Sequence, residues 1–348
     1  MKNLTSDLVP RCIGRYLIDL PRSFVVNPVA RAVIEGITIE TEPMSRNEFE
    51  AYLMNREAQL RSAHMDGAPG TPFLKRVEAN AHVEVGRIFN RAEHTGAPAF
   101  ARTLELLAWK DGVRFSMTLN ATDGTDLKVD SEVIGTVFEE SERRTVEKYK
   151  GINEVPQKLA HLIGVFQRTS GRADHEIPTG PGVCIRHGFI RGPATDQEWI
   201  DLNYYLSTAE DVSFTFHYLS HIGPQSDTLL QRGGSIEPAL KRVDGRTLRK
   251  GVRETNNLRP EEWLMERQVD PGVKDYHFTL ELNSESGNAR EPLLVIDFDS
   301  GSRIPHPERS LEEEATLKPI QKATLGEAES IALWDAVLPT LRRRPNAF

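Results

Sequence analysis

The segment RCIGRYLIDLP at residues 11–21 constrains the fold more than any other part of the chain. Its apolar side chains are mostly two positions apart and a proline ends the run, which is typical of a strand that begins a domain. Residues 181–191 repeat the arrangement of a cysteine, an isoleucine and a short strand after a loop-rich interval. We therefore expect a β-strand at the start of each half of the chain.

Capping and turn residues place further elements in the first half. Ser45 and Glu48 have the spacing of a capping box, which predicts a helix through about residue 65. Asp111 and Gly112 separate two alternating runs, which predicts a hairpin. The expected strands are 11–20, 31–42, 71–79, 81–90, 101–110 and 112–121, and two helices separated at Pro156 are expected within 142–166.

The second half again alternates strands with helices. The expected strands lie near 183–191, 198–207, 212–220, 275–283 and 292–299, with a short helix at 261–267 and a longer one from residue 327. The three arginines at 342–344 would lie at the negative end of the last helix, or would contact anionic lipid.

Length and a loop-rich interval divide the chain into two domains. A chain of 348 residues exceeds one ordinary core. Residues 168–181 are rich in glycine, proline and polar residues and have no periodicity, which is typical of a boundary. We predict an α+β fold of two domains, 1–170 and 171–348, each a mostly antiparallel sheet packed with helices.

The sequence predicts no membrane-spanning segment, because it has no run of about 18 apolar residues. Residues 1–7 lack the apolar core that a secretory signal needs. Two locations therefore stay open: the chain is cytoplasmic, or its leader has been removed.

The negative charge is concentrated in the second half. Of 43 Lys and Arg and 51 Asp and Glu, residues 1–170 hold 22 and 23, which leaves 21 and 28, or −1 against −7. A nucleic-acid partner would require the opposite sign. An acidic domain suits a basic patch on a protein partner, although the excess carboxylates also serve solubility.

The two cysteines, Cys12 and Cys184, lie 172 positions apart and have no zinc-ligand spacing around them. In an oxidising compartment they could form a disulfide between the opening strands of the two halves. The alternative is a pair of buried thiols that behave as small apolar residues.

No catalytic, cofactor-binding or metal-binding motif occurs in the sequence. It contains no Gly-x-Ser-x-Gly elbow, no phosphate-binding glycine loop and no His-Glu-x-x-His. Cys184 and His187 would point to opposite faces of a strand, and His217 and His221 would be too far apart on a strand to share one ion. We therefore expect a protein that is not an enzyme and needs no cofactor.

Two acidic loops of the second half are candidates for partner contact. Asp196 and Glu198 precede one expected strand, and Glu210 and Asp211 precede the next. Loops at the ends of strands can contact a partner while the sheet holds them in place, and the two loops could lie near one another. The alternative is that they are ordinary solvated turns.

The chain resembles the immunity proteins that bacteria pair with lipase effectors of the type VI secretion system. The resemblance extends over most of the chain and is strongest at 11–21, 181–191 and 326–344. It implies a two-domain inhibitor that clamps the lid or cap of a cognate phospholipase effector, acts in the periplasm and protects the producing cell. The alternative from another class is a hydrolase or lipid-handling enzyme with an unrecognised site.

Overall fold

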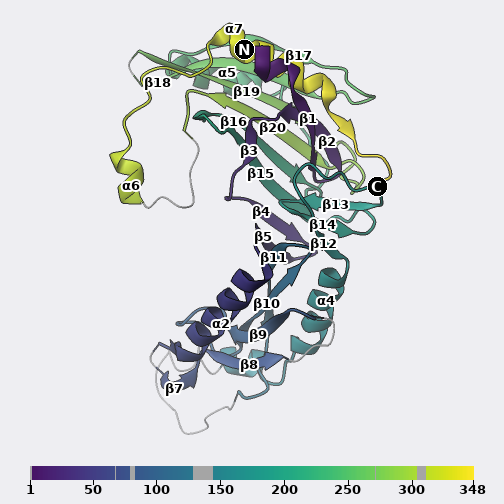
Figure 1. Cartoon of the computed structure of the whole chain (residues 1–348), viewed down its shortest axis with the longest axis vertical. Helices are drawn as coiled ribbons and strands as arrows, with labels where there is room; N and C mark the ends of the chain where they lie inside the picture. The colour runs from purple at the N-terminus through teal and green to yellow at the C-terminus, as the bar shows by residue number, and fades with distance from the viewer. Residues whose placement is uncertain (1, 67, 79–82, 128–143, 271, 304–310) are drawn as a thin grey trace. The chain divides into compact units, whose positions relative to one another are not determined.

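The chain divides into two compact units (Figure 1), described from a computed structural model that covers residues 2–66, 68–78, 83–127, 144–270, 272–303 and 311–348. Unit 1 combines Met1–Glu35 with Ala173–Phe348, and unit 2 is Gly36–Arg172. This division differs from a boundary at residue 170 because the first 35 residues pack with the second half of the chain. The strand pairing and the disulfide described below explain that packing.

Unit 2 is an antiparallel sheet with a helix on each face. The strand order is β5 (Ile37–Pro43), β11 (Val113–Thr122), β10 (Ala101–Lys110), β9 (Gly86–Ala92) and β8 (Leu74–Glu78). Its described elements also include the helices α2 (Arg46–Ser62) and α4 (Val155–Gln167), helical residues at 144–149, and the strands β6 (His64–Met65), β7 (Ala68–Pro72) and β12 (Thr169–Gly171).

The register of β10 places α2 and α4 on opposite faces of this sheet. Leu107 belongs to the buried cluster of Phe49 on α2. Ala108, which points the other way, pairs with Phe115 of β11, whose ring lies 6.5 Å from that of Phe166 on α4. Each helix therefore buries one side of the sheet.

The predicted hairpin and capping box of unit 2 are confirmed. Lys110 pairs with Val113, and the two turn residues between them have positive φ angles of 52° and 79°, as a two-residue hairpin turn requires. The Ser45 hydroxyl accepts a hydrogen bond from the backbone N–H of Glu48 at 3.3 Å, and the Glu48 carboxylate accepts one from the Ser45 N–H at 2.9 Å.

Unit 1 contains a larger antiparallel sheet. Its order is β17 (Arg246–Val252), β18 (Glu261–Asp270), β19 (Val273–Leu282), β20 (Leu293–Ser300), β16 (Ala209–Leu219), β15 (Glu198–Leu206) and β4 (Arg31–Ile34), and β3 (Phe24–Val26) also pairs with β15. Smaller ladders join β1 (Leu8–Ile13), β2 (Tyr16–Pro21) and β21 (Arg342–Arg343), and β13 (Gly182–Ile185) with β14 (Gly188–Arg191). The helices are α1 (Lys2–Ser6), α5 (Gly233–Arg242), α6 (Leu311–Thr316), α7 (Glu327–Val337) and the short η1 (Leu338–Thr340).

An aromatic layer forms the core between this sheet and α7. Trp334 of α7 is fully buried, and its ring lies 5.7 to 6.4 Å from those of Phe214, Phe278 and Phe298. Residues along β15 and β20 alternate between buried and half-buried positions, as expected for a sheet that covers a core on one face. Helix α5 packs on the opposite face through Leu240 and Trp263.

The predicted α+β class is confirmed, but several elements differ from the prediction. The expected helix at 261–267 is wrong, because these residues form strand β18 between β17 and β19. Helix α5 and strand β17 were not predicted from the sequence. Part of the expected strands at 71–79 and 81–90, and the start of the helix expected at 142, lie outside the described residues.

Three expected strands are each split by a turn with a positive φ angle. One of them, 183–191, forms β13 and β14 around His187, whose φ is 48°. Residues 11–20 form β1 and β2 around Gly14, whose φ is 57°, and residues 31–42 form β4 and β5 around Glu35 and Gly36. A Cβ atom on Gly14 would lie 2.5 Å from the Tyr218 ring, so this turn needs glycine for space as well as for its φ angle. In the part of the chain that the structure describes, no helix has the length and apolar content that would let it cross a membrane.

Candidate functional site

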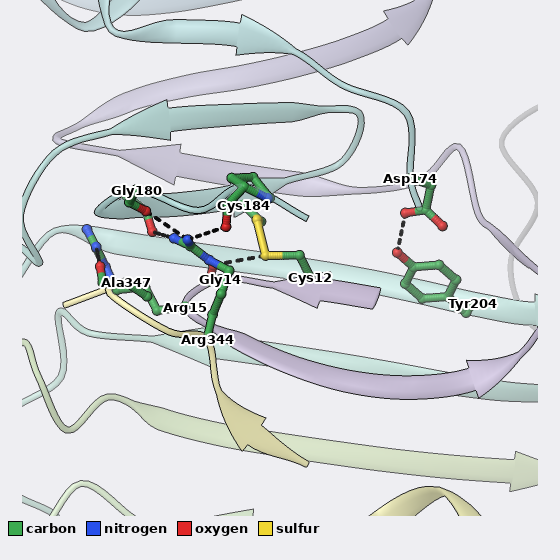
Figure 2. Close-up of a disulfide and its surroundings, with 11 residues drawn as sticks. Cys12, Gly14, Arg15, Asp174, Gly180, Cys184, Tyr204, Arg344 and Ala347 are labelled. Atoms are coloured by element: carbon green, nitrogen blue, oxygen red, sulfur yellow. Dashed lines mark hydrogen bonds between the residues drawn. A yellow bond between two sulfur atoms is a disulfide. The ribbon is translucent and has the colours of Figure 1, made fainter. Parts of the chain in front are cut away.

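A disulfide ties the N-terminal hairpin to the opening strand of the second half. Cys12 and Cys184 are bonded, their Cα atoms lie 5.8 Å apart, and both are fully buried. Figure 2 shows this disulfide in yellow. Beside it, backbone hydrogen bonds of 3.1 and 2.8 Å between Gly14 and Cys184 run in both directions. Nearby, the Tyr204 hydroxyl donates to Asp174 at 2.7 Å. The pairing that the sequence left open is therefore a covalent link within unit 1.

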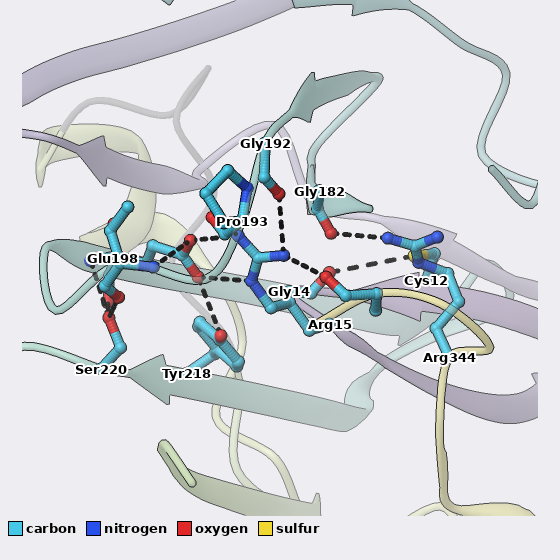
Figure 3. A network of polar contacts seen from close by, with 12 residues as sticks. Cys12, Gly14, Arg15, Gly182, Gly192, Pro193, Glu198, Tyr218, Ser220 and Arg344 are labelled. Atoms are coloured by element: carbon cyan, nitrogen blue, oxygen red, sulfur yellow. Dashed lines mark hydrogen bonds and ion pairs between the residues drawn. The ribbon is translucent and has the colours of Figure 1, made fainter. Parts of the chain in front are cut away.

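Glu198, a candidate for partner contact, is instead an interior residue. It is 1% exposed, and Arg15, also 1% exposed, donates to its two carboxylate oxygens at 2.5 and 3.0 Å. The Tyr218 hydroxyl donates to the same carboxylate at 2.8 Å, and Ser220 accepts the Glu198 backbone N–H at 2.9 Å (Figure 3). The carboxylate is thus occupied by internal donors, which corrects the expectation that it faces a partner.

This buried ion pair is satisfied on every side. The Arg15 guanidinium also donates to the carbonyl oxygens of Pro193 at 2.7 Å and Gly192 at 3.3 Å, and to that of Ala347. Burial and the negative charge of Glu198 together raise the pKa of Tyr218 well above 10. The pair therefore fixes the loop at 192–198 to the hairpin of β1 and β2.

Of the arginines at 342–344, Arg342 lies two positions after the end of η1 and donates to the Thr340 carbonyl at 2.5 Å, so it lies at the negative end of this helical segment. Arg344 is 1% exposed and donates to the carbonyls of Pro178, Gly180 and Gly182 at 2.8, 2.8 and 2.5 Å (Figure 3). Arg342 pairs with Asp19 at 2.9 Å. The C-terminal segment thereby holds the loop at 178–182 in place. Both guanidinium groups bind acceptors within the protein, which does not support the alternative that they contact anionic lipid.

The second acidic loop also has one interior member. Asp211 is 8% exposed and accepts hydrogen bonds from the backbone N–H and the hydroxyl of Thr324 at 2.8 and 2.6 Å. Glu210 is half-buried and lines an open hollow of about 590 Å³ whose other charged residues include Arg303 and Lys322. The hollow is therefore of mixed charge.

The two acidic loops lie at opposite ends of one strand. Asp196 is exposed just before β15 begins at Glu198, and Glu210 lies beyond its end at Leu206. A strand of nine residues spans about 27 Å at 3.3 Å per residue. The loops are therefore not brought together, and Asp196 and Glu210 are the candidate contacts that are exposed and half-buried, respectively.

The cysteine and histidines considered for an enzymatic alternative make other contacts in the structure. Cys184 is in the disulfide and so has no thiolate. His217 on β16 bonds the Asp201 carboxylate at 2.7 Å, which raises the pKa of the imidazole, and His221 stacks on Trp199 with ring centroids 5.5 Å apart. Within the described ranges, no three His, Cys, Asp or Glu side chains are grouped in a way that could hold a metal ion.

Sequence reasoning missed the two buried arginines, Arg15 and Arg344. A charged residue between the apolar runs of β1 and β2 was the available signal for Arg15. The partner of Arg15 lies 183 positions away and that of Arg344 is a set of backbone carbonyls, so neither could be read from local spacing.

These features define an α+β protein of two compact units, in which one unit is cross-linked around a buried ion pair. Family models described as the N-terminal and C-terminal domains of Tle cognate immunity protein 4 match residues 9–172 and 176–346. The chain therefore belongs to the Tle cognate immunity protein 4 family, and the predicted membership in the immunity proteins of type VI lipase effectors is confirmed.

Solved structures of immunity proteins share this fold. The apo structure of the type VI secretion immunity protein TplEi from Pseudomonas aeruginosa is 20% identical with a TM-score of 0.67, and 99% of each chain is covered. The crystal structure of the Tle4-Tli4 complex contains a chain that is 22% identical with a TM-score of 0.68, again with 99% of each chain covered. TplEi with the "L" peptide is 22% identical with a TM-score of 0.61, covering 98% of this chain and 99% of the other. The curated protein sequences give no significant match.

Proposed function

We propose that this immunity protein binds one cognate lipase effector of the type VI secretion system and inhibits it by occupying it, without catalysing a reaction. The match of both family models, which together span residues 9–172 and 176–346, carries this proposal. One of the similar structures is a complex of Tli4 with Tle4, and another is TplEi, an immunity protein of a type VI secretion system.

The internal use of the reactive groups supports a binding role. The only two cysteines are joined, and Glu198 and Asp211 are saturated by internal donors. A rigid scaffold of this kind suits an inhibitor, which needs pre-organised surfaces and no group tuned for proton transfer. Inhibition would follow if the protein held the lid or cap of the effector in its closed state, for which it would need a preference of about 10⁴-fold.

The proposed place of action is the periplasm. A buried disulfide forms and persists in oxidising compartments, and the bacterial periplasm is one of them. Action there would protect the producing cell where an incoming effector meets its lipid.

Contacts with the effector are proposed for both halves, 1–170 and 171–348, as immunity domains. In the second half, we assign Asp196 and Glu210 of the acidic loops to the surface that faces the effector, where they would contact a basic patch. Charges of this kind act mainly on the rate of association and on specificity.

Isolation of a complex with the neighbouring gene's product tests the proposal. The purified chain and the effector should co-elute in gel filtration, and the esterase activity of the effector should disappear in the complex. The matched control is an unrelated lipase, which should keep its activity. Full effector activity in the presence of excess chain would reject the proposal.

A further inference from the structure

A cavity of about 300 Å³ opens at one end of the unit 1 sheet, where β18 starts, β19 ends and β20 starts. In the antiparallel order of this sheet, the same end carries the start of β15 and therefore the loop with Asp196. The hollow beside Glu210 lies at the opposite end. The cavity thus lies at the same end of the sheet as one of the proposed effector contacts.

The charge of the cavity lining is negative. Four glutamates and two arginines line it: Glu261, Glu281, Glu285, Glu291, Arg259 and Arg343. Two charged residues outside the lining form ion pairs with it: Arg232 pairs with Glu281 at 2.5 Å, and Glu254 pairs with Arg259 at 3.5 Å. Their opposite charges cancel, so the net charge of the lining stays at −2.

Two buried polar atoms in the lining have no hydrogen-bond partner of normal geometry among the described residues. One is the hydroxyl of Tyr16, a residue only 1% exposed, and the other is the amide oxygen of Asn283. The Asn283 NH₂ group donates to the backbone carbonyl of Asp227, which can only accept a hydrogen bond. This bond fixes the orientation of the Asn283 amide, so the amide oxygen points away from Asp227. A buried polar atom that the protein leaves unpaired is uncommon and calls for an explanation.

Burial raises the pKa of Tyr16 to about 12. The Arg343 guanidinium lies beside the Tyr16 hydroxyl and partly offsets this rise, because it lowers the pKa through its charge and its hydrogen-bonding contact. The hydroxyl therefore stays protonated at neutral pH and has lone pairs to accept a hydrogen bond.

A ligand for this cavity must be cationic and rich in donors. The glutamate oxygens and the Asn283 oxygen accept only, and the Tyr16 hydroxyl also accepts. A guanidinium supplies five N–H donors in one plane and a fixed positive charge, whereas an ammonium supplies three around a point. The cavity volume is large enough for one long side chain.

We propose that this cavity is a specificity pocket that receives an arginine side chain of the effector, with Tyr16 and Asn283 as hydrogen-bond acceptors at its base and Glu285 as the charged partner at its rim. This inference rests on the proposed function, because it assigns one anchor of the same interface. Arginine residues in desolvated pockets are typical hot spots of protein interfaces.

The isolated chain provides the first test. We would titrate the ¹⁵N-labelled protein with acetyl-arginine amide and follow the side-chain amide signal of Asn283 by NMR, with acetyl-citrulline amide as a neutral probe of the same shape. We expect shifts with the arginine probe, and at least tenfold weaker binding for Glu285→Gln. Equal shifts from both probes, or none at about 10 mM, where a Kd of 1 mM would be nearly saturated, would overturn the proposal.

Effector binding provides the second test. Tyr16→Phe removes only the hydroxyl group and should keep the fold. Each variant loses one charge-assisted hydrogen bond to the arginine, so the affinity for the effector should fall about fivefold in Tyr16→Phe and about tenfold in Glu285→Gln. Glu237→Gln, on an exposed residue of α5 outside the cavity, is the matched control and should bind as the wild type does. Affinities within twofold of wild type in both cavity variants would overturn the effector as the occupant. A wild-type chain that binds no effector would reject the proposed function, while the arginine titration would still decide whether the pocket exists.

Discussion

Replacing Glu198 should destabilise unit 1, whereas replacing Asp196, two positions earlier in the same loop, should not. Glu198→Gln would leave Arg15, 1% exposed, without a counter-charge. Breaking a buried ion pair by removing one partner costs about 3 to 5 kcal/mol. Asp196 is exposed, so Asp196→Asn should change the free energy of unfolding by no more than about 0.5 kcal/mol.

Urea unfolding followed by circular dichroism measures this difference. With a slope of about 2 kcal/mol per molar urea, the loss in Glu198→Gln lowers the midpoint by about 1.5 to 2.5 M. The double variant Arg15→Met/Glu198→Leu, which removes both charges, should recover much of the loss. A Glu198→Gln midpoint equal to that of the wild type would refute the assignment of Glu198 to the interior. A folded Glu198→Gln that fails to bind effector at low temperature would refute it as well.

Three further predictions concern the cross-link, the pH dependence and the surface charge. Replacing Cys12 and Cys184 by alanine opens a loop of 172 residues, and the chain-entropy relation gives a loss of about 5 kcal/mol; equal urea midpoints for both proteins would contradict this. Burial alone would lower the pKa of His277, but Asp299, 2.8 Å away, raises it above 6.5. The contribution of protonated His277 to the free energy of unfolding is complete below about pH 6.5 and is lost as the pH rises through the folded-state pKa. The urea midpoint should therefore fall with rising pH over that window, and Asp299→Asn should make this fall smaller. A midpoint that rises there would contradict the assignment. Glu210→Gln should slow association with the effector at low salt, and a rate equal to wild type at every salt concentration would remove Glu210 from the interface.

Alternation and turn chemistry predicted the strands that cover one core face. Phe214 and Phe216 on β16 alternate with polar residues because Thr215 and His217, on the opposite face of that strand, are only half-buried. The capping box at Ser45 and the hairpin turn at Gly112 depend only on residues close in the sequence, so both could be identified from a few neighbouring residues.

Strand β18 was mistaken for a helix because both of its faces are covered. Trp263 packs toward α5 while Glu262, 1% exposed, accepts a hydrogen bond from Trp334 of α7 and pairs with Arg249. A strand that buries residues on both faces loses the period of two on which recognition depends.

The candidate site was harder to predict than the fold because burial of a carboxylate depends on distant partners. Glu198 and Asp196 are chemically alike and lie two positions apart in the sequence, and the contact of Glu198 with Arg15 of the N-terminal hairpin distinguishes the interior residue from the surface one. The same reasoning applies to Asp211, whose donor Thr324 lies 113 positions away.

The stoichiometry of inhibition tests most directly whether the protein acts by occupying its effector. Effector esterase activity would be measured against increasing amounts of the chain, followed by dissociation in denaturant, refolding and a mass measurement of the effector. We predict that activity falls linearly to zero at one chain per effector and that the recovered effector has an unchanged mass and regains its activity. Complete inhibition by far less than one chain per effector, or an effector with an altered mass, would contradict the account.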